Sequence, residues 1–133
     1  MSIDMEVALR LVLAAVLGAI IGYQRERAKK PAGLRTHMLI CVGSALFTIV
    51  SAYGFGGSAD PARLAAGIVT GIGFLGAGTI IRNREGIVVG LTTAATVWTV
   101  SAIGVAAGAG MYVVSVVTTA LVLIVLFLPH HIR

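Results

Sequence analysis

The amino-acid sequence predicts an all-α membrane protein, a polytopic bundle of about five transmembrane helices that forms a single domain over residues 1–133. Three observations support this fold class. Hydrophobic residues make up 58% of the chain and charged residues only 11%, whereas an ordinary soluble domain carries roughly 25% charged residues. The apolar residues form runs long enough to cross a bilayer, for which about 20 helical residues suffice. The basic residues behind the net charge of +5 lie in short segments between these runs.

Five apolar segments have the length of a membrane span. They cover residues 7–23, 37–55, 62–81, 87–107 and 110–128. The fourth and fifth follow one another without any charged residue between Gly86 and Pro129. A single helix over that stretch would be about twice as long as the hydrocarbon layer is thick. We therefore predict that the chain turns back at Gly108, Ala109 and Gly110.

The lysines and arginines predict the orientation of the spans. Eight of the ten lie in the loops after spans one and three and in the C-terminal tail, and only Arg10 and Arg63 lie on the other side. Because basic residues accumulate in cytoplasmic loops, we expect the N-terminus outside the cytoplasm and the C-terminus inside it. This arrangement indicates membrane topology, so we expect contacts with membrane lipids and no nucleic-acid partner.

A weak internal repeat relates positions that are 57 residues apart. It pairs Arg25 with Arg82 and Ser44 with Ser101, among other identities. The offset places span one on span three and span two on span four, which predicts a parallel two-helix repeat about an axis along the membrane normal. The alternative is that a composition rich in small residues produces these identities by chance.

Span three is unusually rich in glycine. Gly67 and Gly71 form a small-xxx-small face of the kind that lets transmembrane helices pack closely. The candidate packing or pore glycines are Gly67, Gly71, Gly73, Gly76 and Gly78. Packing is the first interpretation, and since other spans carry similar faces we expect a homodimer. The second interpretation is that the run 71–78 unwinds and exposes carbonyl groups, as broken transporter helices do.

The start of span three carries charged residues at the predicted extracytoplasmic mouth. Asp60 followed by Pro61 is typical of a helix that begins with an N-cap carboxylate and a proline in its first position. The functional alternative is that Asp60 and Arg63 form a contact for a cation or a partner. The two roles of Asp60 are compatible.

Span four carries a stripe of hydroxyl groups formed by Thr92, Thr96 and Thr99. Threonines in membrane helices usually bond the backbone of their own helix, and this is the first interpretation. The alternative is a polar conduit. No Asp, Glu, Lys or Arg lies near the middle of a span, which argues against an ion-coupled carrier.

Much of the ionisable chemistry lies at the predicted cytoplasmic ends of the spans. The candidate functional cluster there is Arg25, Glu26, Arg35, His37, Arg82 and Glu85. Glu26 and Glu85 are candidate ligands for Mg²⁺, the one cofactor that the sequence suggests, because Mg²⁺ prefers one or two carboxylates with water. The alternative is that they pair with neighbouring arginines and anchor the helix ends at headgroups. No nucleophile, base and orienting residue fall together, so we predict no enzyme.

Five ordered motifs extend over nearly the whole chain. They are Gly22-Tyr23-Gln24-Arg25-Glu26, Lys30-Pro31-Ala32-Gly33-Leu34-Arg35-Thr36-His37, Asp60-Pro61-Ala62-Arg63, the run 71–78, and Gly90-Leu91-Thr92-Thr93-Ala94-Ala95-Thr96. Together they resemble the MgtC/SapB family of bacterial membrane proteins. The resemblance implies a five-span protein of the bacterial inner (plasma) membrane, linked in some members to growth at low magnesium and survival inside host cells. It also implies action on a membrane partner, the F-type ATP synthase, more than direct magnesium transport.

Two departures from the virulence-type members limit what carries over. Those members have asparagine and cysteine at the positions of Thr92 and Thr99, and they continue into a cytoplasmic ACT-like domain, whereas this sequence ends at Arg133. The sequence is that of a short family member or of a truncated chain. The leading hypothesis is support of magnesium or ion homeostasis through membrane partners. The alternative is a direct cation channel or carrier for Mg²⁺.

Overall fold

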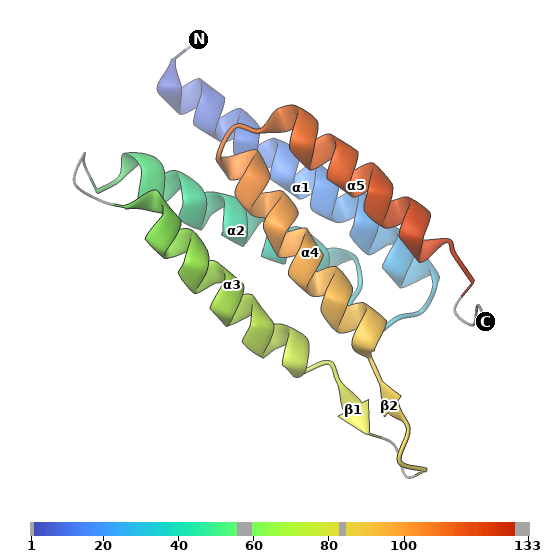
Figure 1. Cartoon of the computed structure of the whole chain (residues 1–133). Coiled ribbons are helices and arrows are strands. Elements are labelled where there is room, and N and C mark those ends of the chain that lie inside the picture. Colours follow the sequence, from blue (N-terminus) through green and yellow to red (C-terminus); the bar gives the residue numbers. More distant parts are fainter. Residues whose placement is uncertain (1, 56–59, 83–84, 130–133) are drawn as a thin grey trace.

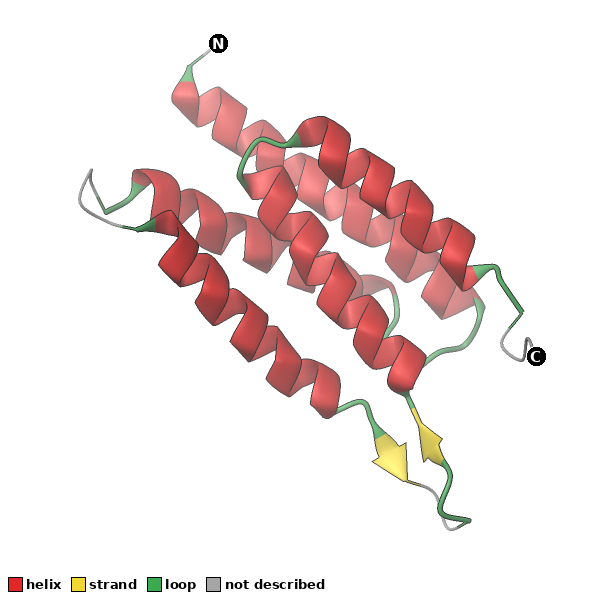
Figure 2. Cartoon of the chain, in the orientation of Figure 1, coloured by secondary structure: helices red, strands yellow, loops and turns green. Residues whose placement is uncertain are grey.

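The computed structural model describes residues 2–55, 60–82 and 85–129, which form a bundle of five helices with a short hairpin (Figure 1). The helices are α1 (Ile3–Arg27), α2 (Leu34–Tyr53), α3 (Pro61–Ala77), α4 (Leu91–Gly108) and α5 (Tyr112–Leu126), and the antiparallel strands are β1 (Ile81–Arg82) and β2 (Val88–Val89). Successive helices run in opposite directions, and the hairpin extends beyond the helices between α3 and α4 (Figure 2).

The helical membrane bundle predicted from the sequence is confirmed. Within the described part of the chain, α1, α2 and α4 are long and apolar enough to cross a membrane, by length and composition, and the apolar helices α3 and α5 are shorter. Large apolar side chains point outward on several helices. Leu39, Phe74 and Val113 are 73%, 82% and 75% exposed. Such a surface suits contact with lipid, because soluble monomers rarely expose apolar patches larger than a few hundred Å².

The observed helices differ from the predicted spans mainly at their ends. α1 is longer than predicted at both ends: Ser2 accepts a hydrogen bond from the N–H of Met5 at its start (3.2 Å), and the charged residues through Arg27 continue the helix. The turn between α4 and α5 lies where it was predicted, and Gly110 adopts a φ of +84° there.

The predicted limits of spans three and four, at residues 81 and 87, are wrong because the chain between α3 and α4 forms the β hairpin. Val88 and Val89 are β-branched, which favours a strand. Gly90 follows them with a φ of +93°, and a Cβ on this residue would collide with the carbonyl oxygen of Thr79. Only glycine combines that backbone conformation with so close an approach to the end of α3.

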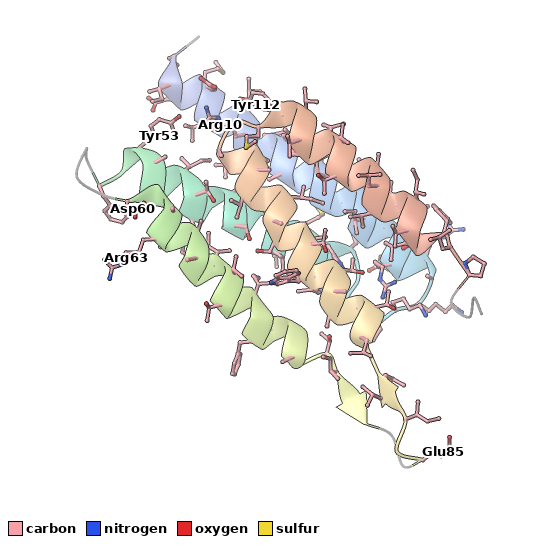
Figure 3. The ribbon with its side chains drawn as sticks, in the orientation of Figure 1. Arg10, Tyr53, Asp60, Arg63, Glu85 and Tyr112 are labelled. Atoms are coloured by element: carbon pink, nitrogen blue, oxygen red, sulfur yellow. The ribbon has the colours of Figure 1, made fainter. Side chains whose placement is uncertain are left out.

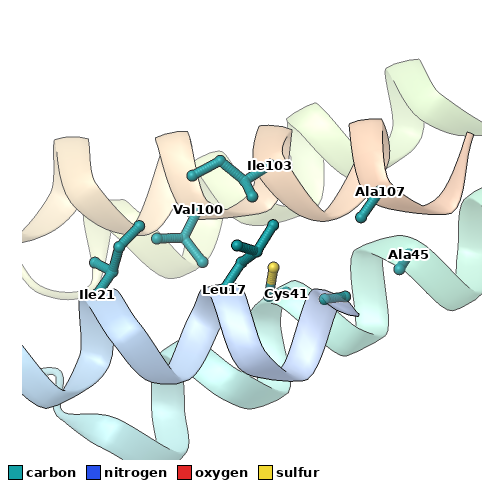
Figure 4. Packing of buried hydrophobic residues seen from close by; sticks show 8 residues of the cluster. Leu17, Ile21, Cys41, Ala45, Val100, Ile103 and Ala107 are labelled. Atoms are coloured by element: carbon teal, nitrogen blue, oxygen red, sulfur yellow. The ribbon is translucent and has the colours of Figure 1, made fainter. Parts of the chain in front are cut away.

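The core lies where α1, α2 and α4 meet (Figure 4). Its buried hydrophobic residues are Ala14, Leu17, Ile21, Cys41, Ala45, Val100, Ile103 and Ala107. A Cβ on Gly18 of α1 would lie 2.7 Å from the carbonyl oxygen of His37, and one on Gly108 would lie 2.5 Å from that of Ala45. Helices whose backbones approach so closely are held by van der Waals contact. These glycine faces of α1 and α4 therefore pack against α2 inside the bundle.

The arrangement of the helices fits the predicted repeat. α2 and α4 run parallel at the centre, α1 packs on both of them, and α3 also packs on both (Figure 1). The hydroxyl oxygens of Ser44 and Ser101, which the 57-residue offset pairs, are 3.0 Å apart. Contact between equivalent residues is expected near a two-fold axis. α5 packs on α4 and α1 and lies outside the repeat.

The glycine run of span three does not unwind. α3 is helical through Ala77, and the N–H of Gly78 donates to the carbonyl oxygen of Phe74 (3.2 Å). The interpretation as a broken helix is wrong, because a helix that faces lipid satisfies its backbone groups internally. The N-cap is confirmed: a carboxylate oxygen of Asp60 accepts the N–H of Ala62 (3.0 Å), and Pro61 is the first helical residue.

Candidate functional site

Two buried arginines lie on α1, one toward each end of the bundle. We call these the Arg10 end, where α1, α3 and α5 start, and the Arg25 end, where α2 and α4 start. Arg10 is 7% exposed and Arg25 is 3% exposed. Because a buried charge is costly unless it is paired and hydrogen-bonded, the partners of each arginine indicate its role.

Arg10 is fully engaged by groups from four helices. Its guanidinium donates to the carboxylate of Glu6 (2.8 Å), the hydroxyl of Tyr53 (3.1 Å), the carbonyl oxygen of Gly108 (3.0 Å) and, more weakly, the hydroxyl of Tyr112 (3.4 Å). Figure 3 shows Arg10 with Tyr53 and Tyr112 at this end. The network joins α1, α2, α4 and α5. From the sequence, Arg10 served only to orient the spans, although Glu6 one helical turn earlier is a usual signal for an ion pair.

Asp60 and Arg63 lie at the start of α3 and are both exposed (Figure 3). The helix cap accounts for Asp60. The N–H of Arg63 donates to the carbonyl oxygen of Asp60 within the same turn (3.1 Å). A contact of these two residues with a cation or a partner stays a prediction.

Arg25 has far fewer partners than Arg10. Its Nη2 donates to the hydroxyl of Thr93 (2.7 Å), the third residue of α4, and its Nε is buried without a partner. Among the described residues, no carboxylate lies within ion-pair distance of Arg25. The guanidinium is therefore a buried cation whose charge is not neutralised within the described chain.

His37 and Gln24 add two further unpartnered atoms at the same end. His37 is fully buried, and its Nδ1 lies 2.8 Å from the carbonyl oxygen of Gly33 while its Nε2 has no partner. Arg25 lies close enough to His37 for its charge to act on the imidazole ring. The Oε1 of Gln24 is also buried and unpartnered. Since buried polar groups are normally hydrogen-bonded, this concentration at the Arg25 end requires an explanation.

Of the predicted cytoplasmic cluster, the structure brings Arg25 and His37 together. Glu26 accepts the N–H of Leu34 (3.3 Å) at the start of α2, and Arg35 is exposed. Glu85 is exposed at the hairpin, away from the helices (Figure 3). Arg82 lies in β1, and its side chain is outside the described part. No group of three or more His, Cys, Asp or Glu that could hold a metal occurs among the described residues, and the Mg²⁺ site at Glu26 and Glu85 stays a prediction.

Two threonines of the α4 stripe, Thr96 and Thr99, bond their own helix, as the first interpretation predicts. Thr96 donates to the carbonyl oxygen of Thr92 (2.7 Å), and Thr99 donates to that of Ala95 (2.8 Å). The threonine that contacts Arg25 is Thr93, which was not among the candidate residues. Its spacing from Thr96 and Val100 places it on the buried face of α4 and was the available signal.

The glycines of α3 differ from those of α1. A Cβ on Gly67, Gly71 or Gly73 would meet nothing within 4 Å, whereas one on Gly76 would lie 3.4 Å from the carbonyl oxygen of Ala94. A groove of about 630 Å³ runs between α2 and α3 and is lined by apolar residues together with Ser44, Gly43, Gly67 and Gly71. This glycine face is thus not consumed within the bundle.

A bundle of five apolar helices with an apolar exterior and buried charges near its two ends defines a polytopic helical membrane protein. Comparison with known families identifies one family. The chain belongs to the MgtC family, which it matches over residues 11–133. This confirms the resemblance drawn from the motifs.

Several curated relatives are similar over most of this chain. It is 48% identical to "Putative magnesium transporter YhiD" of Escherichia coli (strain K12), over 94% of this chain and 61% of the relative. It is 42% identical to Protein SapB of Bacillus subtilis (98% and 60%) and 46% identical to Protein MgtC of Brucella abortus (84% and 46%). The chain thus spans less than two-thirds of the length of each of these three relatives. No solved structure matches.

Proposed function

We propose that this chain supports magnesium or ion homeostasis in the bacterial inner membrane by binding membrane partners, without passing cations through its own bundle. Membership of the MgtC family and similarity to a relative named as a magnesium transporter support the link with magnesium. The buried charges support the proposal that no cation passes through the bundle. Arg10 and Arg25 lie near the two ends of the packed core. A cation entering at the Arg25 end would meet a positive charge that has no carboxylate partner among the described residues, whereas cation pathways are lined by carboxylates or carbonyl groups.

The middle of the bundle also lacks ligands for Mg²⁺. No Asp or Glu is buried among the described residues, and the buried polar side chains between the two arginines are hydroxyls. Ser44 bonds to Ser101, and Thr48 donates to the carbonyl oxygen of Ser44 (2.8 Å). These hydroxyls are engaged within the protein, and Mg²⁺ sites usually employ carboxylates with several waters.

The first partner that we propose is a second copy of the chain, docked along the glycine face of α3. The open space around Gly67 and Gly71 and the groove beside them support this proposal. Small-xxx-small faces allow a second helix to approach closely in lipid, where van der Waals contact drives association. The second proposed partner is the F-type ATP synthase, which the family resemblance implies.

A direct cation channel or carrier is the second candidate function, and one observation favours it. A groove of about 560 Å³ lies between α4 and α5 and includes Thr92, Thr96, Thr99 and Thr118 in its lining. If two copies faced each other across this groove, hydroxyl groups would line a path between them. Such a path would run between chains and would avoid both buried arginines.

Flux through liposomes separates the two functions. The purified chain is reconstituted into liposomes that contain a Mg²⁺-sensitive dye, and external Mg²⁺ is then added. We expect no uptake above that of empty liposomes, while an added Mg²⁺ ionophore should give the full signal and show that the vesicles are sealed. Protein-dependent uptake would overturn the proposal. If Thr92→Ala with Thr99→Ala then abolished that uptake, the path would lie in the α4–α5 groove.

A further inference from the structure

We propose that the Arg25 end of the bundle contains a binding site for a phosphate group, built from Arg25, His37 and the first turns of α2 and α4. The site would exist whether or not the chain binds partners or conducts ions, so it goes beyond the proposed function. It uses groups that the fold leaves unsatisfied. Four independent features support it.

The first feature is the unneutralised charge of Arg25. The side chain is 3% exposed, and among the described residues it has no carboxylate partner. Arg10 shows what this chain does when an arginine is structural, because Glu6 and three other acceptors surround it. A buried cation without a counter-ion is strongly unfavourable, so an anion from outside the chain is the missing partner.

The second feature is the chemistry of the unpartnered atoms. The Nε of Arg25 is a hydrogen-bond donor. In the neutral His37 ring the Nδ1 carries the proton and donates to Gly33, so the Nε2 can accept from a protonated phosphate oxygen. Two nitrogens of one guanidinium can bind two oxygens of a phosphate, which a lysine cannot do. Gln24 supplies an amide whose oxygen can accept from a protonated phosphate oxygen, and rotation of the amide would present its N–H groups instead.

The third feature is the pair of helix starts around these residues. α2 begins after Gly33 and α4 begins after Gly90, and neither of these N-cap residues has a side chain that could cap the helix. His37 is the fourth residue of α2, and Thr93, the partner of Arg25, is the third residue of α4. Glu26 caps one N–H of α2, that of Leu34. The positive ends of two parallel helices therefore add to the charge of Arg25 and favour an anion.

The fourth feature is the depth of the site in the membrane. α1 has 25 residues and is about 37 Å long, which exceeds the roughly 30 Å of hydrocarbon. Because Arg25 lies in the last turn of α1, we expect it at the level of the lipid headgroups. The phosphate can therefore come from a phospholipid or from dissolved phosphate. Because the nitrogens are shielded, we expect the long Arg25 side chain to rotate as the ligand enters.

Thermal unfolding in a phosphate-free maltoside detergent tests the site. The loss of helical circular dichroism gives the unfolding midpoint of the full chain. One arm compares sodium phosphate with sodium chloride at equal ionic strength. The second arm compares phosphatidylglycerol with a phosphate-free diacylglycerol. We expect at least one phosphate source to raise the midpoint of the parent protein. A response to dissolved phosphate indicates a free anion, and a response only to phosphatidylglycerol indicates a lipid headgroup.

Three variants assign the response to Arg25. Arg25→Met should abolish the rise in the midpoint, and Arg27→Gln, which removes an exposed charge two residues away, should retain it. If Arg25→Met does not fold, Arg25→Lys keeps the charge and should weaken the apparent affinity about tenfold or more, because the bidentate contact is lost. No response from the parent to either source would overturn the proposal and leave buried water as the partner of these atoms. An equal response from the parent and the Arg25 variant that folds would also overturn it.

Discussion

The predicted 57-residue repeat pairs α1 with α3, yet the chain uses these two helices differently. α1 buries two arginines and brings Gly18 against the backbone of α2. α3 has no buried charge among its described side chains, and the space around Gly67 and Gly71 is open. The small-residue face of α1 therefore packs inside the core, whereas the small-residue face of α3 remains free. The difference shows that the neighbours of a small-residue face decide its role, and its composition does not.

The largest expected effect separates the two glycine faces directly. Gly18→Leu should destabilise the protein by about 3 kcal/mol or more, because its Cβ alone would lie 2.7 Å from the carbonyl oxygen of His37 and 2.9 Å from the Cβ of Cys41. Gly67→Leu is the matched control and should fold as the parent does. Unfolding in detergent with added denaturant measures both. Equal stabilities of the two variants would remove the distinction between α1 and α3.

The next effect concerns the charge that α1 has and α3 lacks. Arg10→Met removes the donor of the hydrogen bonds to Tyr53 and Gly108, and the loss of these two bonds should cost about 2 kcal/mol. The ion pair with Glu6 adds little, because that carboxylate is partly exposed. Arg63→Met, at an exposed position on α3, should change stability little. The same unfolding assay compares them, and a harmless Arg10→Met would show that the network does not hold the helices together.

A smaller effect is expected from single members of that network. Tyr53→Phe removes one hydrogen bond of 3.1 Å and should cost about 1 kcal/mol, while Tyr112→Phe removes a contact of 3.4 Å and should cost less. In an Arg10→Met background, Tyr53→Phe should add almost nothing. If the two losses were additive, the tyrosine would act independently of Arg10.

Arg25→Met should leave basal stability nearly unchanged or raise it. The parent protein buries a charge at this position without a carboxylate, and replacement of such a charge by an apolar side chain of similar length is often neutral or stabilising. The measurement is the unfolding midpoint in phosphate-free detergent, next to that of Arg10→Met. A loss as large as that of Arg10→Met would make the two arginines alike and would identify Arg25 as a structural residue.

The smallest effect on folding and the clearest effect on assembly are expected from the α3 face. Gly71→Leu should keep the fold, since nothing lies within 4 Å of its Cβ position, and should reduce the homodimer. Amine crosslinking in native membranes, or disulfide crosslinking of a cysteine introduced on the exposed face of α3, measures the dimer. Gly73→Leu is a useful comparison because it is equally open but does not line the α2–α3 groove. Monomer alone in the parent protein would exclude this use of the face.

The sequence allowed much of the fold to be predicted, because long apolar runs and the placement of charges depend on local composition. The α4–α5 turn and the Asp60 cap followed from local patterns and are present. The hairpin was missed because its two-residue strands are too short to show a period. The partners of Arg10 and the isolation of Arg25 were also missed, since they depend on residues up to 102 positions away and on burial that only packing reveals.

The partners of Arg10 are synthesised at different times, because they come from four different helices. Glu6 is synthesised before Arg10, so α1 enters the membrane with this one pair already possible. The other acceptors follow on α2, at the end of α4 and at the start of α5. The guanidinium therefore gains its bonds step by step during translation, and the set is complete only when α5 has entered. A nascent chain that stops before α5 leaves one Arg10 donor without its partner, so this side chain reports whether the bundle of five helices has assembled.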